Sequence, residues 1–138
     1  MGYALLTFPP NEAALSTDIP ASIRRAYEEA SACFRARAFT AAAVMCRKTL
    51  EGVCAAHGIE ERGLLPSLKR MRAEGLIDDR LYEWADQLRI VGNEAVHDVK
   101  ITVSREDSRD TLDFTRAIAE YLFAYRMKFE RFKQRRGK

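Results

Sequence analysis

The chain has 138 residues, of which 47% are hydrophobic and 31% are charged, a composition typical of soluble globular domains. This length suits one domain with a real core, so we expect a single domain over residues 18–138, preceded by an extended arm over residues 1–17. No apolar run is long enough to span a membrane, and the first ten residues lack the pattern of a secretion signal. We therefore expect a cytoplasmic protein without membrane contact.

The net charge of +3 is unevenly distributed along the chain. Residues 125–138 hold seven basic residues and one glutamate, so they carry +6 and leave −3 for residues 1–124. A basic end of this kind can bind phosphate backbones, and it is also typical of a solvated helix terminus. If RNA binds, we expect this end to add affinity without sequence specificity.

The three cysteines, Cys33, Cys46 and Cys54, are odd in number and lack the Cys-x-x-Cys spacing of zinc sites. All three lie among alanines in helical patterns, which favours reduced, buried thiols. The sequence also lacks a phosphate-binding glycine loop, a Gly-x-Ser-x-Gly elbow and a His-Glu-x-x-His motif. We therefore expect no metal and no cofactor.

The first half of the chain predicts an arm and three helices. In the arm, residues 3–8 could form a short strand or a strip along the helices, and two prolines follow. The first helix should follow a cap at Thr17 or Asp18, and the second a cap at Thr40. The glycines after the second and third helices can adopt the left-handed conformation that ends a helix. The predicted helices span residues 18–37, 39–57 and 64–74.

Two longer helices complete the predicted all-α fold. Asp78 should cap the fourth helix and Ser104 the last, which could run for about 30 residues, or 45 Å. In the fourth helix an apolar set repeats at three and four residues and should enter the core, with Trp84 as its anchor. Its members are Leu81, Trp84, Leu88, Val91 and Ala95. In the last helix the same spacing joins Phe114, Ile118, Tyr121, Leu122, Tyr125, Phe129 and Phe132.

A polar stripe lies almost opposite that apolar set on the fourth helix. Arg89, Asn93 and His97 recur every four residues, with Asp86 nearby and Glu94 beside them. Imidazole can transfer protons near neutral pH, and guanidinium can hold a phosphate, so these groups suit metal-independent RNA cleavage. The alternative is structural, in which the stripe hydrogen-bonds a helix end and the following loop.

Two motifs carry a resemblance to a known superfamily. One is Arg47-x-x-x-Glu51 on the second helix; the other is Arg89-x-x-Gly92-Asn93-Glu94-Ala95-x-His97. With these motifs and the matching segments at residues 27–30, 41–51 and 75–77, the chain resembles the HEPN superfamily over about residues 18–125. It is most similar to a prokaryotic HEPN-like domain family of unknown function.

The resemblance implies a five-helix bundle that pairs as a symmetric dimer about the motif helices. The candidate binding residues are Asn93, Glu94, Asp86, Arg47 and Glu51. HEPN ribonucleases carry an arginine, often followed by a polar residue, and a histidine four to six residues beyond the arginine. Asn93 and His97 match the last two, whereas the arginine position is Gly92.

The missing arginine bears on catalysis and on partners. Arg89, one turn earlier, could substitute for it, so His97 and Arg89 are the candidate catalytic pair. We nevertheless expect little or no ribonuclease activity, because glycine cannot stabilise developing charge. The apolar flank at Ile90 favours a homodimer that unites two copies of Asn93 and His97.

Three functions therefore remain open from the sequence. The first is a dimeric module that binds RNA, a nucleotide or a partner protein in prokaryotic defence or stress. The second is a toxin-like endoribonuclease, and the third is a purely structural interaction module. The resemblance makes a restriction or toxin–antitoxin protein a possible partner, since similar domains occur beside such genes.

Overall fold

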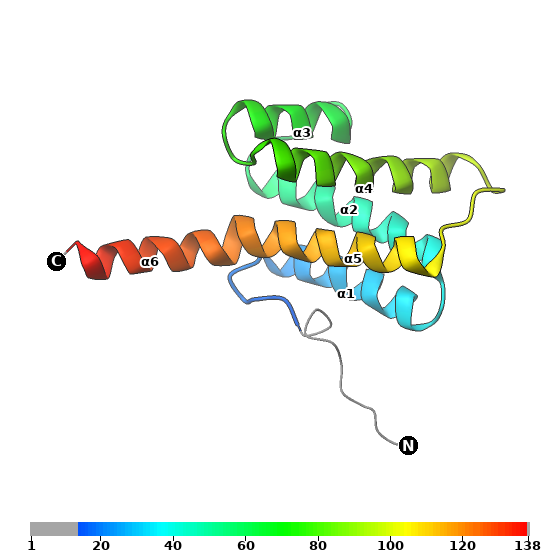
Figure 1. Ribbon diagram of the computed structural model, residues 1–138, viewed down its shortest axis with the longest axis horizontal. Coiled ribbons are helices and arrows are strands. Elements are labelled where there is room, and N and C mark those ends of the chain that lie inside the picture. The colour runs from blue at the N-terminus through cyan, green and yellow to red at the C-terminus, as the bar shows by residue number, and fades with distance from the viewer. Residues whose placement is uncertain (1–13, 138) are drawn as a thin grey trace, which may run out of the picture.

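The computed structural model describes residues 14–137 and contains only helices and connecting loops over that range. Three helices, α5, η3 and α6, follow one another without a break, and η3 is a π-helical segment, so the chain forms the five-helix bundle that the sequence predicted (Figure 1). Residues 3–8, the predicted strand or strip, lie outside the described residues. The elements are α1 (Ala21–Arg35), α2 (Phe39–Ala56), α3 (Leu64–Ala73), α4 (Asp79–His97), α5 (Arg105–Ala119), η3 (Glu120–Tyr125) and α6 (Arg126–Arg136).

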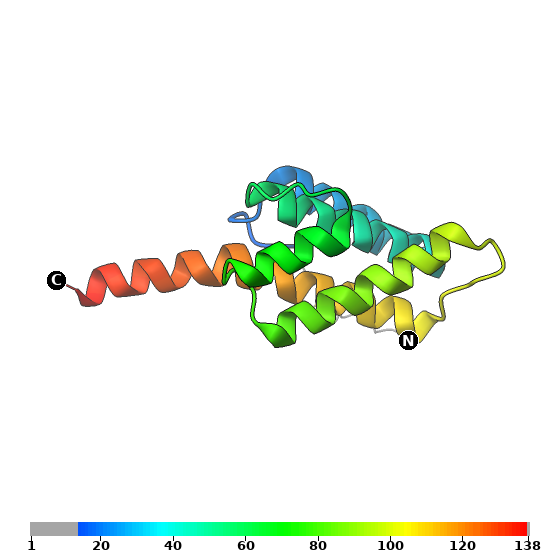
Figure 2. The same ribbon diagram turned by 90° about the horizontal axis from the view of Figure 1, so that it is seen from above.

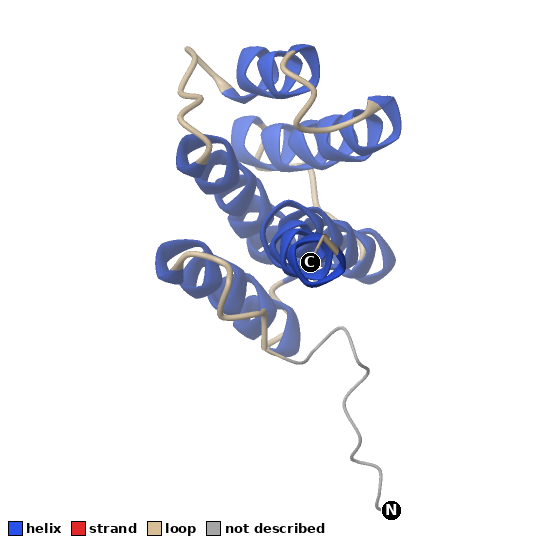
Figure 3. Ribbon diagram, turned by 90° about the vertical axis from the view of Figure 1, so that its left-hand side faces the viewer, coloured by secondary structure: helices blue, strands red, loops and turns tan. Residues whose placement is uncertain are grey.

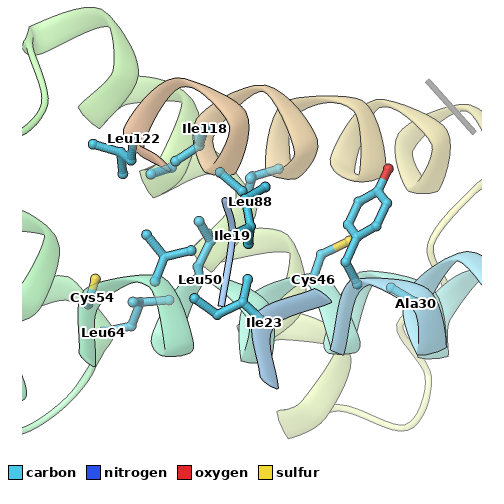
Figure 4. Close-up of a cluster of buried hydrophobic side chains, with 14 of the residues drawn as sticks. Ile19, Ile23, Ala30, Cys46, Leu50, Cys54, Leu64, Leu88, Ile118 and Leu122 are labelled. Carbon is cyan, nitrogen blue, oxygen red and sulfur yellow. The ribbon is translucent and has the colours of Figure 1, made fainter. Parts of the chain in front are cut away.

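The second helix, α2, is the centre of the bundle and packs against α1, α4 and α5. Figure 3 shows α1 and α3 at opposite ends of the bundle, and the view from above in Figure 2 shows α3 beside α4. The side chains between these helices form the core in Figure 4, where Ile23, Leu50 and Leu88 meet from three helices. Each is at most 2% exposed, and burying such a side chain contributes about 1.5–3 kcal/mol.

Helix ends follow the predicted signals in the second half of the chain. The Asp78 carboxylate accepts a hydrogen bond from the Leu81 amide at 2.8 Å, and the Ser104 hydroxyl accepts one from the Asp107 amide at 3.0 Å. Gly75, after α3, has a positive φ of 77°, as its role in ending that helix requires. These caps place the start of α4 and of α5 where the sequence predicted them.

The caps predicted for the first two helices were wrong. The residue before α1 is Pro20, and neither Thr17 nor Asp18 caps the helix, because its first turn begins beyond their reach. Thr40 lies inside α2, where its hydroxyl accepts a hydrogen bond from the Val103 amide at 3.0 Å. That bond ties the α4–α5 connection to the start of α2.

The predicted core face of α4 was rotated from the observed one. Ala85, Leu88 and Gly92 are the buried residues of this helix, whereas Trp84 and its predicted partners other than Leu88 are only half-buried. The reason is the close contact with α2, which selects the small side chains at 85 and 92. Trp84 instead lies at the edge, with its ring stacked on Phe114 at 5.4 Å between centroids.

The long C-terminal helix is covered only in its first part. Ile118 and Leu122 are buried, as predicted, and α6 has no buried residue. Figure 1 shows α6 extending past the bundle, where the other helices offer it no surface to cover. Phe129 and Phe132 on α6 are therefore exposed. Three earlier members of the predicted apolar stripe, on α5 and η3, are exposed as well: Phe114, Tyr121 and Tyr125.

Candidate functional site

The candidate site starts at the contact between α2 and α4, where Gly92 faces Arg47. A Cβ atom at Gly92 would lie 2.9 Å from the Cβ of Arg47 and 3.2 Å from its Cδ. The absence of a side chain at Gly92 therefore lets the aliphatic stem of Arg47 cross α4 directly. Any larger residue at position 92, including arginine, requires the two helices to separate.

Arg47 is the more buried partner of an ion pair along α2. Its Nη1 lies 3.4 Å from the Oε2 of Glu51, one turn further on. The Nε of Arg47 is buried and has no hydrogen-bond partner among residues 14–137. A donor in that state has lost its water without full compensation. The guanidinium is thus positioned by packing on Gly92 rather than by a complete set of hydrogen bonds.

Arg89 is held by a carboxylate on its own helix. Its Nε donates to the Oδ1 of Asp86 at 2.8 Å, and the two side chains are 20% and 25% exposed. This short, partly buried pair is stronger than a surface ion pair. A phosphate would have to compete with Asp86 for this guanidinium, although the other nitrogens remain available for an acceptor.

The polar stripe winds from the edge of the core into solvent. A step of four residues turns an ideal helix about 40° past a full turn, so the three members do not share one direction. Arg89 and Asn93 are half-buried, whereas His97, the last residue of α4, is exposed together with Glu94. His97 has no hydrogen bond or ion pair with the described part of the chain.

These positions limit the chemistry of a single chain. Arg89 and His97 are separated by about 12 Å along the helix axis, which is two turns. General acid–base catalysis needs the proton-transfer group and the charge-stabilising group at one reacting centre. Of the predicted site residues, the structure pairs Arg47 with Glu51 and Arg89 with Asp86, but it does not bring His97 to either pair.

Gly92 inside the fourth helix predicted close packing or a kink, and the structure shows close packing against Arg47. A glycine inside a helix costs about 1 kcal/mol relative to alanine and therefore indicates a close approach. The sequence could not tell which residue approaches it. His57, the other histidine, has a structural role at the end of α2, where its Nδ1 lies 2.9 Å from the carbonyl oxygen of Val53.

Two cavities lie near the motif helices. One of about 430 Å³ separates α2 from the start of α3 and is bordered by Lys48 and by three carboxylates, Glu51, Glu60 and Glu61. Its charge therefore disfavours phosphate. The other, of about 410 Å³, separates α4 from the long C-terminal helix and includes Trp84.

The cysteines form no site either. Burial raises the pKa of the Cys46 thiol to about 12 and that of the Cys54 thiol to about 11, so both stay protonated near neutral pH. Cys46 and Cys54 are buried as expected, and Cys33 is half-buried. Across residues 14–137, histidine, cysteine, aspartate and glutamate side chains form no cluster able to hold a metal ion. None of the described helices has both the length and the apolarity that crossing a bilayer requires.

Comparison with known proteins gives the chain a family. No curated protein and no solved structure matches it. The family described as Domain of unknown function (DUF4145) matches residues 28–135, a range that runs from the second half of α1 to the last turn of α6. Because this match covers well over half of the sequence, the chain belongs to the DUF4145 family.

Proposed function

We propose that this DUF4145 protein is a HEPN-like homodimer that binds RNA in prokaryotic defence or stress, acts in the cytoplasm and does not cleave its ligand. The observation that carries this proposal is the packing of Arg47 on Gly92. It fills the position of the HEPN arginine with a stem from α2, and Arg89 and Asn93 lie half-buried on α4 within one turn of Gly92. Two guanidinium groups and an amide suit phosphate and base recognition.

RNA fits the proposal better than a free nucleotide. A nucleotide needs a cavity with partners for its phosphates. The cavity beside Glu51 is bordered by three carboxylates and one lysine, so it repels phosphate. The polar stripe of α4 lies instead on an open surface, which suits an extended chain.

The proposed dimer would double this surface. Ile90 is half-buried beside Arg89, and a second copy placed against it would bring two copies of Asn93 and His97 together. Light scattering at micromolar concentration should give twice the mass of one chain, and Ile90→Asp should reduce it. A monomer at that concentration would contradict the proposal, and Met127→Asp, the same change at an exposed apolar site on α6 outside the proposed interface, is the control.

Ribonuclease activity is the second candidate function, because His97 and Arg89 keep suitable chemistry. The pairing of Arg89 with Asp86 and its distance from His97 favour binding over cleavage. A metal-free assay on structured and single-stranded RNA compares the wild type with His97→Ala and Arg89→Ala. We expect no cleavage by any of them. Cleavage by the wild type that both substitutions abolish, in folded proteins, would establish the ribonuclease instead.

RNA binding itself is tested by fluorescence anisotropy with a labelled oligonucleotide. Arg89→Ala and Asn93→Ala should each weaken binding, since each removes a contact of the proposed surface. Gln87→Ala is the control, because Gln87 is an exposed, uncharged residue of α4 outside the stripe. Unchanged affinity in both stripe variants would show that α4 does not bind RNA and would favour a structural module that binds a partner protein.

A further inference from the structure

The end of the long C-terminal helix exposes aromatic side chains that no other helix of the described structure covers. Phe129 is 56% exposed and Phe132 is 46% exposed, and the preceding Tyr125 is 61% exposed. The three follow a four-then-three spacing, so they form one stripe along the helix. Figure 1 shows that α6, the helix that contains Phe129 and Phe132, projects from the bundle. Apolar surface of this size on a projecting helix points to a binding site.

Cations are interleaved with these rings. A shallow groove of about 690 Å³ along α6 is lined by the three aromatic residues and by Lys128, Arg131 and Arg135. The Arg135 guanidinium lies 5.9 Å from the centre of the Phe132 ring, and the Lys133 amine lies 5.1 Å from that of Phe129. Each phenyl ring therefore has a positive charge beside it.

Most of this charge is not neutralised by other described residues. Glu130 is the sole carboxylate among the residues of α6, and it pairs with Lys133 at 3.4 Å. Arg131 lies 3.7 Å from Asp18. The other four cations of the helix have no ion pair among residues 14–137: Arg126, Lys128, Arg135 and Arg136.

These charges decide between possible occupants of the stripe. A second α6 would bring two strongly positive helices together, and like charges at such an interface oppose association. An anionic membrane would attract the helix, but Arg136 follows Phe132 by four residues and Phe129 by seven, so it lies within the aromatic stripe. Insertion of the rings would bury that charge. A single-stranded nucleic acid accepts both groups, because its bases stack on aromatic rings while its phosphates pair with cations.

We propose that α6 is an arm that binds single-stranded RNA, with Phe129, Phe132 and Tyr125 stacking bases and the interleaved Lys and Arg side chains holding the backbone. The choice of RNA as the ligand rests on the proposed function, whereas the choice of the arm as the binding site rests on the residues of the arm itself. Stacking accepts every base, so the arm selects unpaired strands over duplexes without reading a sequence. The α4 surface would then bind a different part of the same RNA.

The test measures anisotropy of a labelled twelve-nucleotide oligouridine with the full chain. Phe129→Leu and Phe132→Leu keep the apolar volume and remove the aromatic face, so each should weaken binding about five-fold or more. Met127→Leu, at another exposed apolar site on α6, is the matched control and should leave the affinity unchanged. Because no residue of α6 is buried, all three proteins should unfold at the same temperature as the wild type.

The salt dependence separates the cations from the rings. Lys128→Gln and Arg135→Gln together should reduce the slope of log K against log salt by about 1.4, since each charge on a single strand contributes about 0.7. The phenylalanine variants should lower the affinity and keep the slope. A duplex of the same length should bind more weakly than the single strand, and single-stranded DNA should bind within a few-fold of RNA.

Several results would overturn the proposal. Wild-type protein that binds no oligouridine, or phenylalanine variants that bind as tightly as the wild type, would show that α6 does not stack bases. Stronger binding to vesicles with anionic phospholipid than to RNA would identify α6 as a membrane anchor. If the α6 variants bind RNA more weakly while Arg89→Ala and Asn93→Ala bind it as tightly as the wild type, the arm is a binding site and the α4 surface is not. If only Arg89→Ala and Asn93→Ala bind RNA more weakly, the α4 surface is a binding site and the arm is not.

Discussion

Helices α2 and α6 share the same spacing of apolar residues and differ entirely in what covers them. Seven residues of α2 are buried and none of α6 is. α2 lies between three other helices, whereas α6 extends beyond the bundle (Figure 1). A repeat of three and four residues thus identifies one face of a helix but does not show whether that face packs inside the protein.

The residues between the apolar positions distinguish the two helices. α2 has alanines at 41–43 and Gly52, small side chains that allow neighbouring helices to approach closely. α6 has six cations in eleven residues, and burying them would need as many partners. Composition around the stripe therefore predicts the core helix and the projecting helix better than the stripe itself does. The following predictions test this comparison.

The largest effect is expected at Leu50, which is 1% exposed at the centre of α2. Leu50→Ala should lower the free energy of unfolding by about 2–5 kcal/mol, because it removes buried methyl groups and leaves a cavity. Chemical denaturation followed by circular dichroism measures the loss. A value near that of a surface substitution would show that α2 is not the centre of the core.

Truncation of Trp84 should cost less stability than truncation of a fully buried tryptophan would. The sequence predicted a core position for Trp84, and truncation of a buried tryptophan costs about 3–5 kcal/mol. Its observed place is half-buried against Phe114, so Trp84→Ala should cost about 1–3 kcal/mol. The single tryptophan also reports its environment by fluorescence, and wild-type emission should indicate partial contact with water. Emission of a fully buried indole would contradict this position.

Gly92→Ala tests the contact that forms the candidate site. Alanine gains about 1 kcal/mol of helix propensity, but its Cβ would lie 2.9 Å from that of Arg47, and such overpacking costs about 1–3 kcal/mol. We expect a net loss of up to about 2 kcal/mol by thermal unfolding. Gly52→Ala is the matched control, because a Cβ there meets Ile23 at an ordinary 3.4 Å, and it should be neutral or stabilising.

A second background identifies the cause of the Gly92→Ala effect. Arg47→Gly removes both atoms that the new Cβ would approach, so Gly92→Ala should cost less in that background than in the wild type. Equal costs in the two backgrounds would assign the loss to the α4 backbone rather than to Arg47.

The sequence predicted the helices well, whereas the site residues stay a prediction. Caps such as Asp78 and Ser104 act within one turn, so local pattern is enough to locate them. The core face of α4 depends on α2, and only the folded bundle shows that Gly92 faces Arg47. Arg89, Asn93 and His97 recur every four residues on α4. Each four-residue step turns the helix about 40° past a full turn, so His97 and Arg89 do not face the same direction.

The buried thiol of Cys46 predicts a stability that falls with alkaline pH. Its folded pKa is raised to about 12 from an ordinary value of about 9, so above pH 9 the unfolded chain loses the proton while the folded chain keeps it. Stability should therefore decline between about pH 9 and 12, by at most about 1.4 kcal/mol per pH unit. Denaturation of wild type and Cys46→Val at pH 9 and 10 measures the difference. Parallel profiles would contradict a thiol held neutral by burial.

The smallest effect is expected in α6, where the comparison began. Phe132→Ala removes an aromatic ring from a position that is 46% exposed on a helix without a buried residue, so stability should change by no more than about 0.5 kcal/mol. Leu122→Ala is the control in the same long helix, and since Leu122 is 3% exposed its loss should cost about 2–5 kcal/mol. A ring that adds little stability but remains exposed is consistent with a role in binding. A large loss at Phe132 would mean that α6 packs against another surface in solution, and a second copy of the chain would then be its first candidate partner.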